Sequence, residues 1–264
     1  MNHLGSPLQP LIDLLNTFNN EGAKFRPTEI YNEGWLLKIL LHEYSKHSEI
    51  ESPLRFYPGA DWYSESMLPT RFKARYQGDE QAESRTNADG VIGHIKVGEK
   101  GKADLELDDD AKQLTVVEAK MNSPLSKGTT KAPDFDQAAR NVACMVEVLT
   151  CNDEVLNKPV LCKDKMEHLS FVVIAPKDQI DSGKFSEFMN EDNIKEKVKN
   201  RAYSYKNSVV DKTNHEQYIE WYENCFAPVI DSIHTEKLSW ESAISKLPNS
   251  ERINAFYQKC KEYN

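Results

Sequence analysis

The feature that most constrains this chain is an apolar strand that runs directly into charged residues. Residues 114–120 read Leu-Thr-Val-Val-Glu-Ala-Lys, so Glu118 and Lys120 share one face of the strand while Val117 and Ala119 share the other. A buried strand that ends in an acid and a base needs a reason, because burying unpaired charge is costly. Two reasons are open at this point: a mutually satisfied ion pair, or a site for chemistry.

The pattern around this strand predicts a mixed α/β fold. Apolar residues at helical spacing, period-two alternation and Pro or Gly breakers separate the chain into distinct elements. The predicted elements are a helix over 28–44, a loop over 48–68, strands over 71–76, 91–97, 103–107 and 114–121, a helix from 133 or 134 to 149, and a strand over 169–175. From about residue 184 onward the pattern is helical and strand signals stop. We therefore expect a core over 28–180 with a central mixed sheet flanked by helices, a helical C-terminal extension over 184–264, and an N-terminal segment over 1–27.

The strands over 103–107 and 114–121 are predicted to form a hairpin with its turn around 108–112. If this hairpin is symmetric about Ala111, Asp104 lies directly across from Glu118, with Cβ atoms roughly 5 Å apart. Two carboxylates at that distance repel each other unless a cation lies between them, and hard oxygen ligands suit Mg²⁺ or Mn²⁺. Asp89 is a rival for the first acid, but its Asp-Gly sequence is more typical of a turn. Lys120, on the same face as Glu118, is placed to orient an attacking water or steady a phosphate charge.

The first predicted helix carries an acid within its apolar stripe. Glu33 falls between Leu40 and Tyr44 on a helical wheel, beside Leu37. An unpaired carboxylate there is costly to bury, so a shared metal site is one explanation. The other is that Glu33 bonds the free backbone amides at the start of the helix.

Together these residues resemble the PD-(D/E)XK nuclease superfamily. The resemblance covers roughly residues 28–176: Asp104, thirteen intervening residues, Glu118-Ala-Lys120, a preceding helix with Glu33, and a following helix that begins Phe135-Asp-Gln-Ala-Ala-Arg. It implies a restriction-endonuclease-like core in which Asp104 and Glu118 bind a divalent metal and Lys120 assists the water. Glu33 matches a glutamate that many members place on the first core helix, and Gln137 matches a glutamine on the helix after the ExK strand. The chain departs from the family name at Ala103, which stands where the proline is expected.

The resemblance further implies a Mg²⁺-dependent nuclease, with DNA favoured over RNA as substrate. Restriction or another defence role, repair, and mobile-element processing are all open. Many members of the superfamily cut as dimers, so a homodimer is possible. The alternative is a catalytically silent module that keeps the fold to bind nucleic acid or protein. The trio of Asp104, Glu118 and Lys120 argues against that alternative, because binding alone does not require it.

Basic residues near the predicted core are candidates for contact with nucleic acid. Arg71, Lys73 and Arg75 share a predicted strand face that either tracks a phosphate backbone or is simply solvated. Lys127 and Lys131 lie in the loop after the ExK strand, and Arg140 follows on the next helix. The net charge of −9 is unusual for a nucleic-acid binder, although a local basic face is sufficient for binding.

Cysteine usage and hydropathy predict a cytoplasmic protein. The five cysteines are odd in number and include no CxxC pair, which predicts reduced thiols and neither a disulfide framework nor a zinc site. The first 15 residues lack the pattern of a signal peptide, and the apolar runs are too short to span a bilayer, which needs about 20 residues. We therefore expect no membrane partner.

Overall fold

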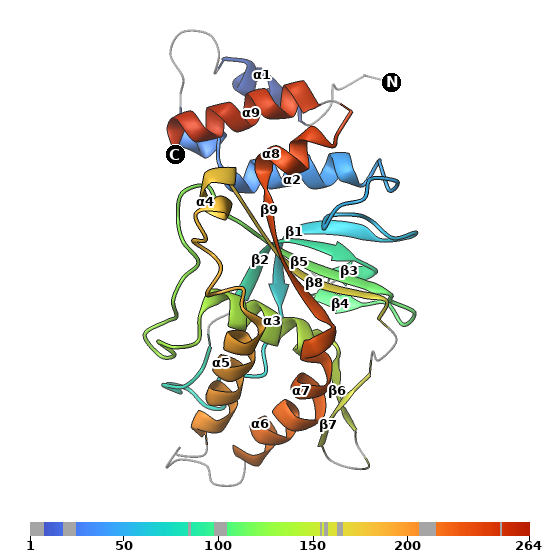
Figure 1. Ribbon diagram of the computed structural model, residues 1–264, viewed down its shortest axis with the longest axis vertical. Helices are drawn as coiled ribbons and strands as arrows, with labels where there is room; N and C mark the ends of the chain where they lie inside the picture. The colour runs from blue at the N-terminus through green and yellow to red at the C-terminus, as the bar shows by residue number, and fades with distance from the viewer. Residues whose placement is uncertain are drawn as a thin grey trace.

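A computed structural model describes residues 8–17, 25–83, 86–97, 105–153, 155, 158–162, 166–205, 215–248 and 250–264. It shows a mixed α/β protein in which a five-stranded sheet lies between two groups of helices (Figure 1). The helices are α1 (Gln9–Thr17), α2 (Glu33–Tyr44), α3 (Gln137–Val148), α4 (Lys177–Asp181), α5 (Glu191–Ser204), α6 (His215–Trp221), α7 (Ala227–Val229), α8 (Trp240–Ser245) and α9 (Ser250–Tyr263). The strands are β1 (Asp61–Leu68), β2 (Thr86–Gly93), β3 (Ile95–Val97), β4 (Leu105–Leu107), β5 (Gln113–Ala119), β6 (Thr150–Asp153), β7 (Lys158–Leu161), β8 (His168–Ala175) and β9 (Ile233–Ser239).

The central sheet has the strand order β1-β2-β5-β8-β9. β1 pairs with β2 and β2 pairs with β5 in antiparallel fashion, whereas β5, β8 and β9 are parallel. The carboxyl ends of these three parallel strands therefore meet at one edge of the sheet. In open α/β sheets this edge is where ligands usually bind.

Each face of the sheet is covered by its own set of helices and its own apolar core (Figure 1). On one face α2, α8 and α9 form a core that includes Val117, Leu37 and Trp240. On the other face α3, α5 and the segment 215–232 form a core that includes Val116 and Val142. Both faces of β5 are thus buried, which explains why this strand reads as a continuous apolar run.

The C-terminal part of the chain completes the sheet and both helical layers. β9 is the fifth strand, parallel to β8, so the prediction that strands stop near residue 184 is wrong. Within β9 only Ile233 and Leu238 are buried, and its middle reads His-Thr-Glu-Lys. An edge strand of this composition has no apolar run to mark it in the sequence.

The predicted strand over 71–76 is a loop in the structure, and the preceding segment, predicted as a loop, contains β1. The Phe72 ring lies in a cluster with the rings of Phe135, Tyr205 and Trp221. The alternation of basic and apolar residues in this segment therefore does not come from a strand. The Phe72 side chain enters the core, while the arginines on either side of it pair with buried acids.

Two cysteines are joined in the structure. Cys151 in β6 and Cys162 directly after β7 form a disulfide with Cα atoms 5.7 Å apart, which corrects the prediction that all five thiols are reduced. The antiparallel β6–β7 ladder brings the two residues together. Cys144, Cys225 and Cys260 are buried free thiols, as structural cysteines usually are.

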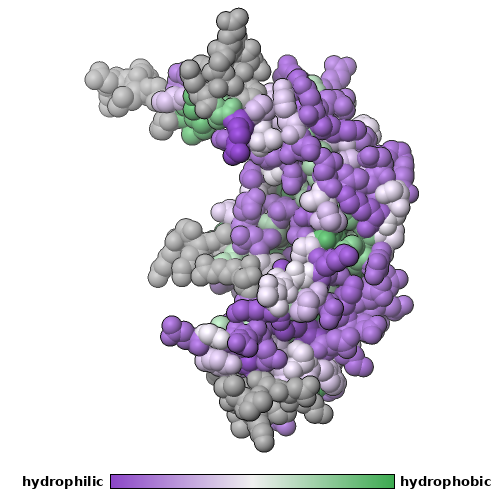
Figure 2. All heavy atoms as spheres, turned by 90° about the vertical axis from the view of Figure 1, so that its left-hand side faces the viewer, coloured by the Kyte–Doolittle hydropathy of each residue, from purple (hydrophilic) through white to green (hydrophobic). Residues whose placement is uncertain are grey.

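The surface seen in Figure 2 is dominated by hydrophilic side chains. Exposed apolar residues gather on and beside α1, where Leu8, Leu11, Ile12 and Leu14 are exposed. Within the part of the chain that the structure describes, no helix has both the length and the apolar character needed to cross a bilayer.

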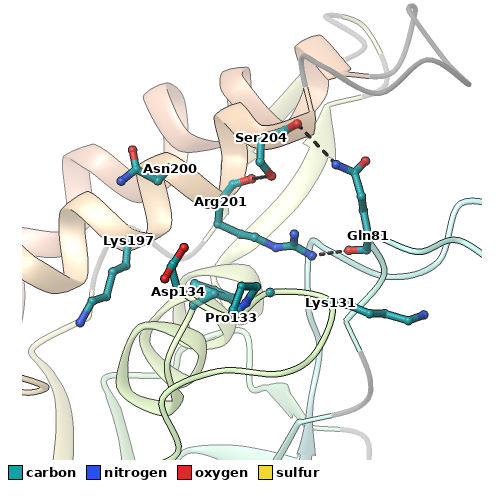
Figure 3. Close-up of a pocket in the computed structure, with 10 residues that line it drawn as sticks. Gln81, Lys131, Pro133, Asp134, Lys197, Asn200, Arg201 and Ser204 are labelled. Atoms are coloured by element: carbon teal, nitrogen blue, oxygen red, sulfur yellow. Dashed lines mark hydrogen bonds between the residues drawn. The ribbon is translucent and has the colours of Figure 1, made fainter.

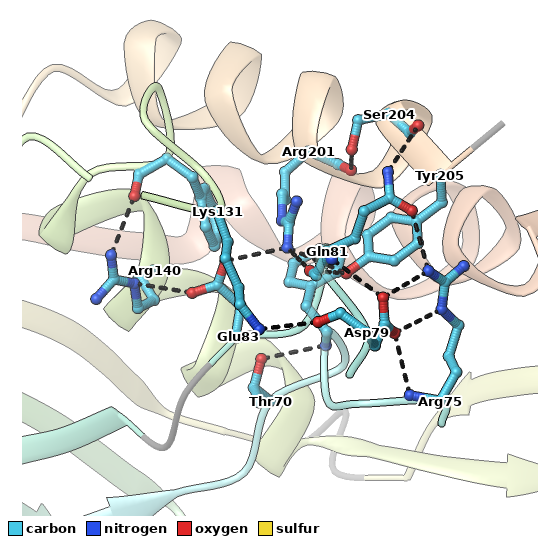
Figure 4. A network of polar contacts seen from close by, with 12 residues as sticks. Thr70, Arg75, Asp79, Gln81, Glu83, Lys131, Arg140, Arg201, Ser204 and Tyr205 are labelled. Atoms are coloured by element: carbon cyan, nitrogen blue, oxygen red, sulfur yellow. Dashed lines mark hydrogen bonds and ion pairs between the residues drawn. The ribbon is translucent and has the colours of Figure 1, made fainter. Parts of the chain in front are cut away.

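A buried ionic network fastens the loop over 69–83 to the helices below the sheet (Figure 4). Glu83 lies between two guanidinium groups, 3.3 Å from Arg140 Nε and 3.1 Å from Arg201 Nη2. Burial raises the pKa of the Glu83 carboxyl, while the two arginines oppose that shift. Nearby, Arg75 pairs with the buried Asp79 at 2.8 Å.

Removing Glu83 should destabilise the protein strongly. Glu83→Ala leaves two buried guanidinium groups without their counter-ion, for which we expect a loss of about 3–5 kcal/mol in the free energy of unfolding. Glu106→Ala, at an exposed position of β4, is the matched control and should change stability by less than about 0.5 kcal/mol. Urea unfolding measures both, and equal midpoints for the two variants would contradict a structural role for Glu83.

Candidate functional site at the end of β5

The acid that faces Glu118 across the sheet is Asp89, and the predicted Asp104 hairpin does not form. β4 pairs with β3, whereas β5 pairs with β2 and β8. Gly90 pairs with Val117, so the next position places Asp89 directly opposite Glu118. The Ala119 amide also donates to Asp89 Oδ2 at 2.8 Å. Asp104 itself lies outside the described residues.

The Asp-Gly sequence at 89–90 predicts a turn, but Gly90 has a different role in the structure. It lies inside β2, and a Cβ atom there would come within 2.9 Å of Leu41 Cδ1 and 3.0 Å of Leu37 Cδ2. The glycine therefore allows α2 to pack closely on the strand, a common reason for glycine in a strand. Helix packing, not turn formation, explains the Asp-Gly sequence.

The Glu118 carboxylate is 1% exposed and is surrounded by three hydrogen-bond donors. Lys120 Nζ lies 2.6 Å and Gln137 Nε2 2.5 Å from Oε1, and Asn141 Nδ2 lies 3.2 Å from Oε2. Gln137 and Asn141 are one helical turn apart on α3, so both reach the same carboxylate. The structure thus brings together three of the predicted site residues: Glu118, Lys120 and Gln137.

The position of Gln137 is fixed by the start of α3. Asp136 caps this helix by accepting a hydrogen bond from the Ala139 amide at 2.9 Å, and Lys197 Nζ binds the same carboxylate at 2.7 Å. Gln137 Oε1 also accepts from the Ser126 amide at 3.1 Å. The loop after β5 and the first turn of α3 are therefore both tied to Glu118.

The backbone of Lys120 is held from two sides. Its amide donates to the Ile174 carbonyl at 2.8 Å, which continues the ladder between β5 and β8. Its carbonyl accepts from Trp240 Nε1 at 2.9 Å, at the start of α8. The Lys120 side chain is 12% exposed, and its amine contacts the buried Glu118 carboxylate.

The site contains two neighbouring carboxyl groups whose negative charges repel each other. Burial, and then the charge of Asp89, raise the pKa of Glu118 to about 8. Burial also raises the pKa of Asp89, with a further contribution from Glu65. Desolvation and like-charge repulsion both favour protonation, and a cation between the groups would relieve the repulsion.

Glu33 does not join these acids. It lies in the first turn of α2, directly after the N-cap Asn32. Burial, and then the charge of Glu33, raise the pKa of Cys260 on α9. Among the described residues, no hydrogen bond or ion pair links Glu33 to Asp89, Glu118 or Lys120. The second explanation considered above, an acid at a helix start, therefore fits its position better.

A different acid, Glu65, lies beside the site and carried no signal in the sequence. The register of β1 and β2, with Ser64 opposite Gly90 and Ser66 opposite Ala88, places Glu65 opposite Asp89. Glu65 has φ 55, an uncommon backbone conformation for a residue other than glycine. Such positions are enriched at functional sites.

Most of the basic residues predicted to contact nucleic acid have internal partners. Arg71 pairs with Glu147 at 3.0 Å, Arg75 with Asp79, and Arg140 with Glu83. Lys131 donates to the Asp79 carbonyl at 2.8 Å, while Lys73 and Lys127 are exposed. The predicted basic strand face is therefore absent from the described loop over 71–76.

A cavity of 240 Å³ lies between residues 131–135 and α5 (Figure 3). Arg201 crosses it and donates to the Gln81 carbonyl, while Gln81 Nε2 donates to the Ser204 carbonyl at 3.4 Å. Neither Asp89 nor Glu118 lines this cavity. It is a separate feature, and the acids at the end of β5 remain the candidate reaction centre.

The site fits a divalent cation of the Mg²⁺ type. Mg²⁺ is usually bound through one or two carboxylates and keeps several waters, which matches a pair formed by Asp89 and Glu118. Among the described residues no cluster of three or more His, Cys, Asp or Glu side chains is arranged to hold a metal. Asn141 Oδ1, next to Glu118, is buried without a hydrogen-bond partner and could accept from a water of such an ion.

Comparisons with protein-family models, curated proteins and solved structures give no significant match.

The raised pKa of Glu118 makes stability depend on pH in a definite direction. In metal-free buffer between pH 4.5, its ordinary pKa, and about 8, the folded protein binds more protons than the unfolded chain. Stability must then fall as pH rises through this range. Glu118→Gln keeps the shape without this titration, so its stability relative to wild type should increase by about 2 kcal/mol or more from pH 5 to pH 8. Thermal unfolding across this range measures the difference, and parallel curves would contradict a raised pKa.

Proposed function

We propose that this protein is a metal-dependent nuclease of the PD-(D/E)XK type, with Asp89, Glu118 and Lys120 at its centre. The observation that carries the proposal is the placement of two carboxylates and an amine on adjacent strands, at the ligand-binding edge of the sheet. The order of elements supports it: a helix, then strands with the two acids, then a helix that returns a glutamine to the second acid. In this proposal Asp89 replaces Asp104 as the first acid.

Each residue has a distinct task in hydrolysis of a phosphodiester bond. Asp89 and Glu118 hold the divalent ion, which when bound supplies a Lewis acid for the phosphate and lowers the pKa of water. Lys120 Nζ orients the attacking water and donates hydrogen bonds to the developing negative charge on the phosphate oxygens. Gln137 and Asn141 are positioning residues, because they hold the Glu118 carboxylate in place.

The substrate class comes from the resemblance to the superfamily. It favours DNA over RNA, with restriction, other defence or repair as the biological setting. A homodimer is part of this proposal, because many members of the superfamily cut as dimers. Mg²⁺ is the expected cofactor, and Mn²⁺ the expected substitute.

Substitutions should separate the two possible first acids. Asp89→Asn, Glu118→Gln and Lys120→Ala should each lower the cleavage rate by about 100-fold or more, since each removes a group that acts on the transition state. Asp104→Asn should leave cleavage within about threefold of wild type, as should Glu106→Gln, an exposed control on β4. Cleavage of plasmid, linear and single-stranded DNA with Mg²⁺, Mn²⁺ or chelator measures these rates. Full activity of Asp89→Asn with loss in Asp104→Asn would restore the first assignment.

Metal binding can be measured without any substrate. Titration of Mn²⁺, followed by calorimetry or electron paramagnetic resonance, should show a site in the wild type that is lost in Asp89→Asn and in Glu118→Gln. Affinity should rise with pH towards 8, because the ion and the Glu118 proton compete for the same carboxylate. Equal Mn²⁺ binding by Asp89→Asn and the wild type would exclude Asp89 as a ligand.

A further inference from the structure

An exposed tryptophan lies at the start of α2. Trp35 is 48% exposed, whereas the next residues on the core side of this helix, Leu36 and Leu37, are fully buried. Its amide is held by the N-cap, since Trp35 N donates to Asn32 Oδ1 at 3.0 Å. The backbone under the ring is therefore fixed while the ring remains open to a partner. Tryptophan in such a position is typical of binding surfaces.

A lysine links this ring to the candidate active site. Lys38 Nζ lies 5.5 Å from the centre of the Trp35 ring and 3.7 Å from Glu65 Oε1. The Lys38 amine thus lies near both the tryptophan ring and the Glu65 carboxylate, so the three side chains are neighbours on the surface. We call these three residues the α2 rim.

The α2 rim meets the catalytic strands at Glu65. This residue lies opposite Asp89 in the register of β1 and β2, and its charge contributes to the raised pKa of Asp89. Gly34 lies against the same contact, because a Cβ atom on it would be 3.9 Å from Glu65 Oε1 and 3.8 Å from Lys38 Nζ. The start of α2 is thus packed against Glu65, and the path from the tryptophan to Asp89 runs through Lys38 and Glu65.

We propose that Trp35 stacks on an unpaired base of the nucleic acid while Lys38 binds the adjoining phosphate. The inference depends on the proposed nuclease function and specifies its substrate as a single strand, or a strand with a base out of its stack. Inside a duplex the bases are stacked on one another and cannot lie on an external ring. Aromatic rings beside basic groups are the usual means of holding single strands. Lys38 has three donors, so it can hold Glu65 and a phosphate together.

The proposal is tested by binding without turnover, in buffer with chelator. The probes are a fluorescein-labelled oligodeoxythymidylate and a labelled hairpin duplex, followed by fluorescence anisotropy. Trp35→Ala should bind the single strand about tenfold more weakly than the wild type, with duplex binding unchanged, and Trp35→Phe should retain most of the affinity. Tyr76→Ala removes another exposed aromatic ring, in the loop before Asp79, and should have no effect.

Lys38→Ala supplies a second measurement. Loss of one phosphate contact should reduce the slope of log affinity against log salt by about 0.7 for a single strand. Thermal unfolding of each variant confirms that it is folded.

Equal single-strand affinity of Trp35→Ala and wild type would overturn the proposal, as would an equal loss on the duplex or no single-strand binding by the wild type. Because no cleavage is required, these outcomes are independent of the Asp89→Asn experiment, which tests the nuclease function itself.

Discussion

The arrangement of the site depends on one buried carboxylate, Glu118, at the point where β5 leaves the core. An isolated carboxylate at that depth would be too costly, so the fold must supply donors for it. Lys120 comes from the same strand, whereas Gln137 and Asn141 come from α3 after a loop of 17 residues (120–136). The strand, the loop and the helix are therefore constrained together. The arrangement of the side chains at the site follows from the need to supply hydrogen-bond donors to the Glu118 carboxylate.

The register of β2 against β5 is the second constraint, and packing under α2 helps to set it. Gly90 leaves room for Leu37 and Leu41 of α2, so β2 can lie under that helix only with a residue of this size at this position. Asp89, the residue before Gly90, accepts a hydrogen bond from the Ala119 amide, next to Glu118. The close packing of Gly90 under α2 thus helps to hold Asp89 beside the end of β5.

The sequence predicted the parts of the fold that have strong periodicity, and it failed where partners are distant. β5, β8, α2 and α3 were found because each carries a clear apolar pattern, and Glu118, Lys120 and Gln137 were correctly expected to meet. The predicted hairpin was wrong because a hairpin joins neighbours in sequence, whereas β5 pairs with β2, a strand more than 20 residues earlier, and β8, a strand about 50 residues later. Edge strands β1 and β9 lack an apolar run, so nothing in the sequence distinguishes them from loops. The role of the arginines in 71–76 was mispredicted. Basic and apolar residues alternate in the same way whether the basic residues pair with buried acids or face a phosphate.

Under the proposed function, the acidic balance of the chain limits how it would hold a nucleic acid. A net charge of −9 does not attract phosphates at long range, and Arg75, Arg140 and Arg201 are paired with buried acids. The proposed affinity would then come from short-range contacts: a divalent ion between two acids, a few lysines, and stacking on an aromatic ring. Stacking on an aromatic ring does not depend on net charge, so it is open to an acidic protein. The exposed Trp35 beside Lys38 is consistent with this limit, because it adds affinity without adding positive charge to the rest of the surface.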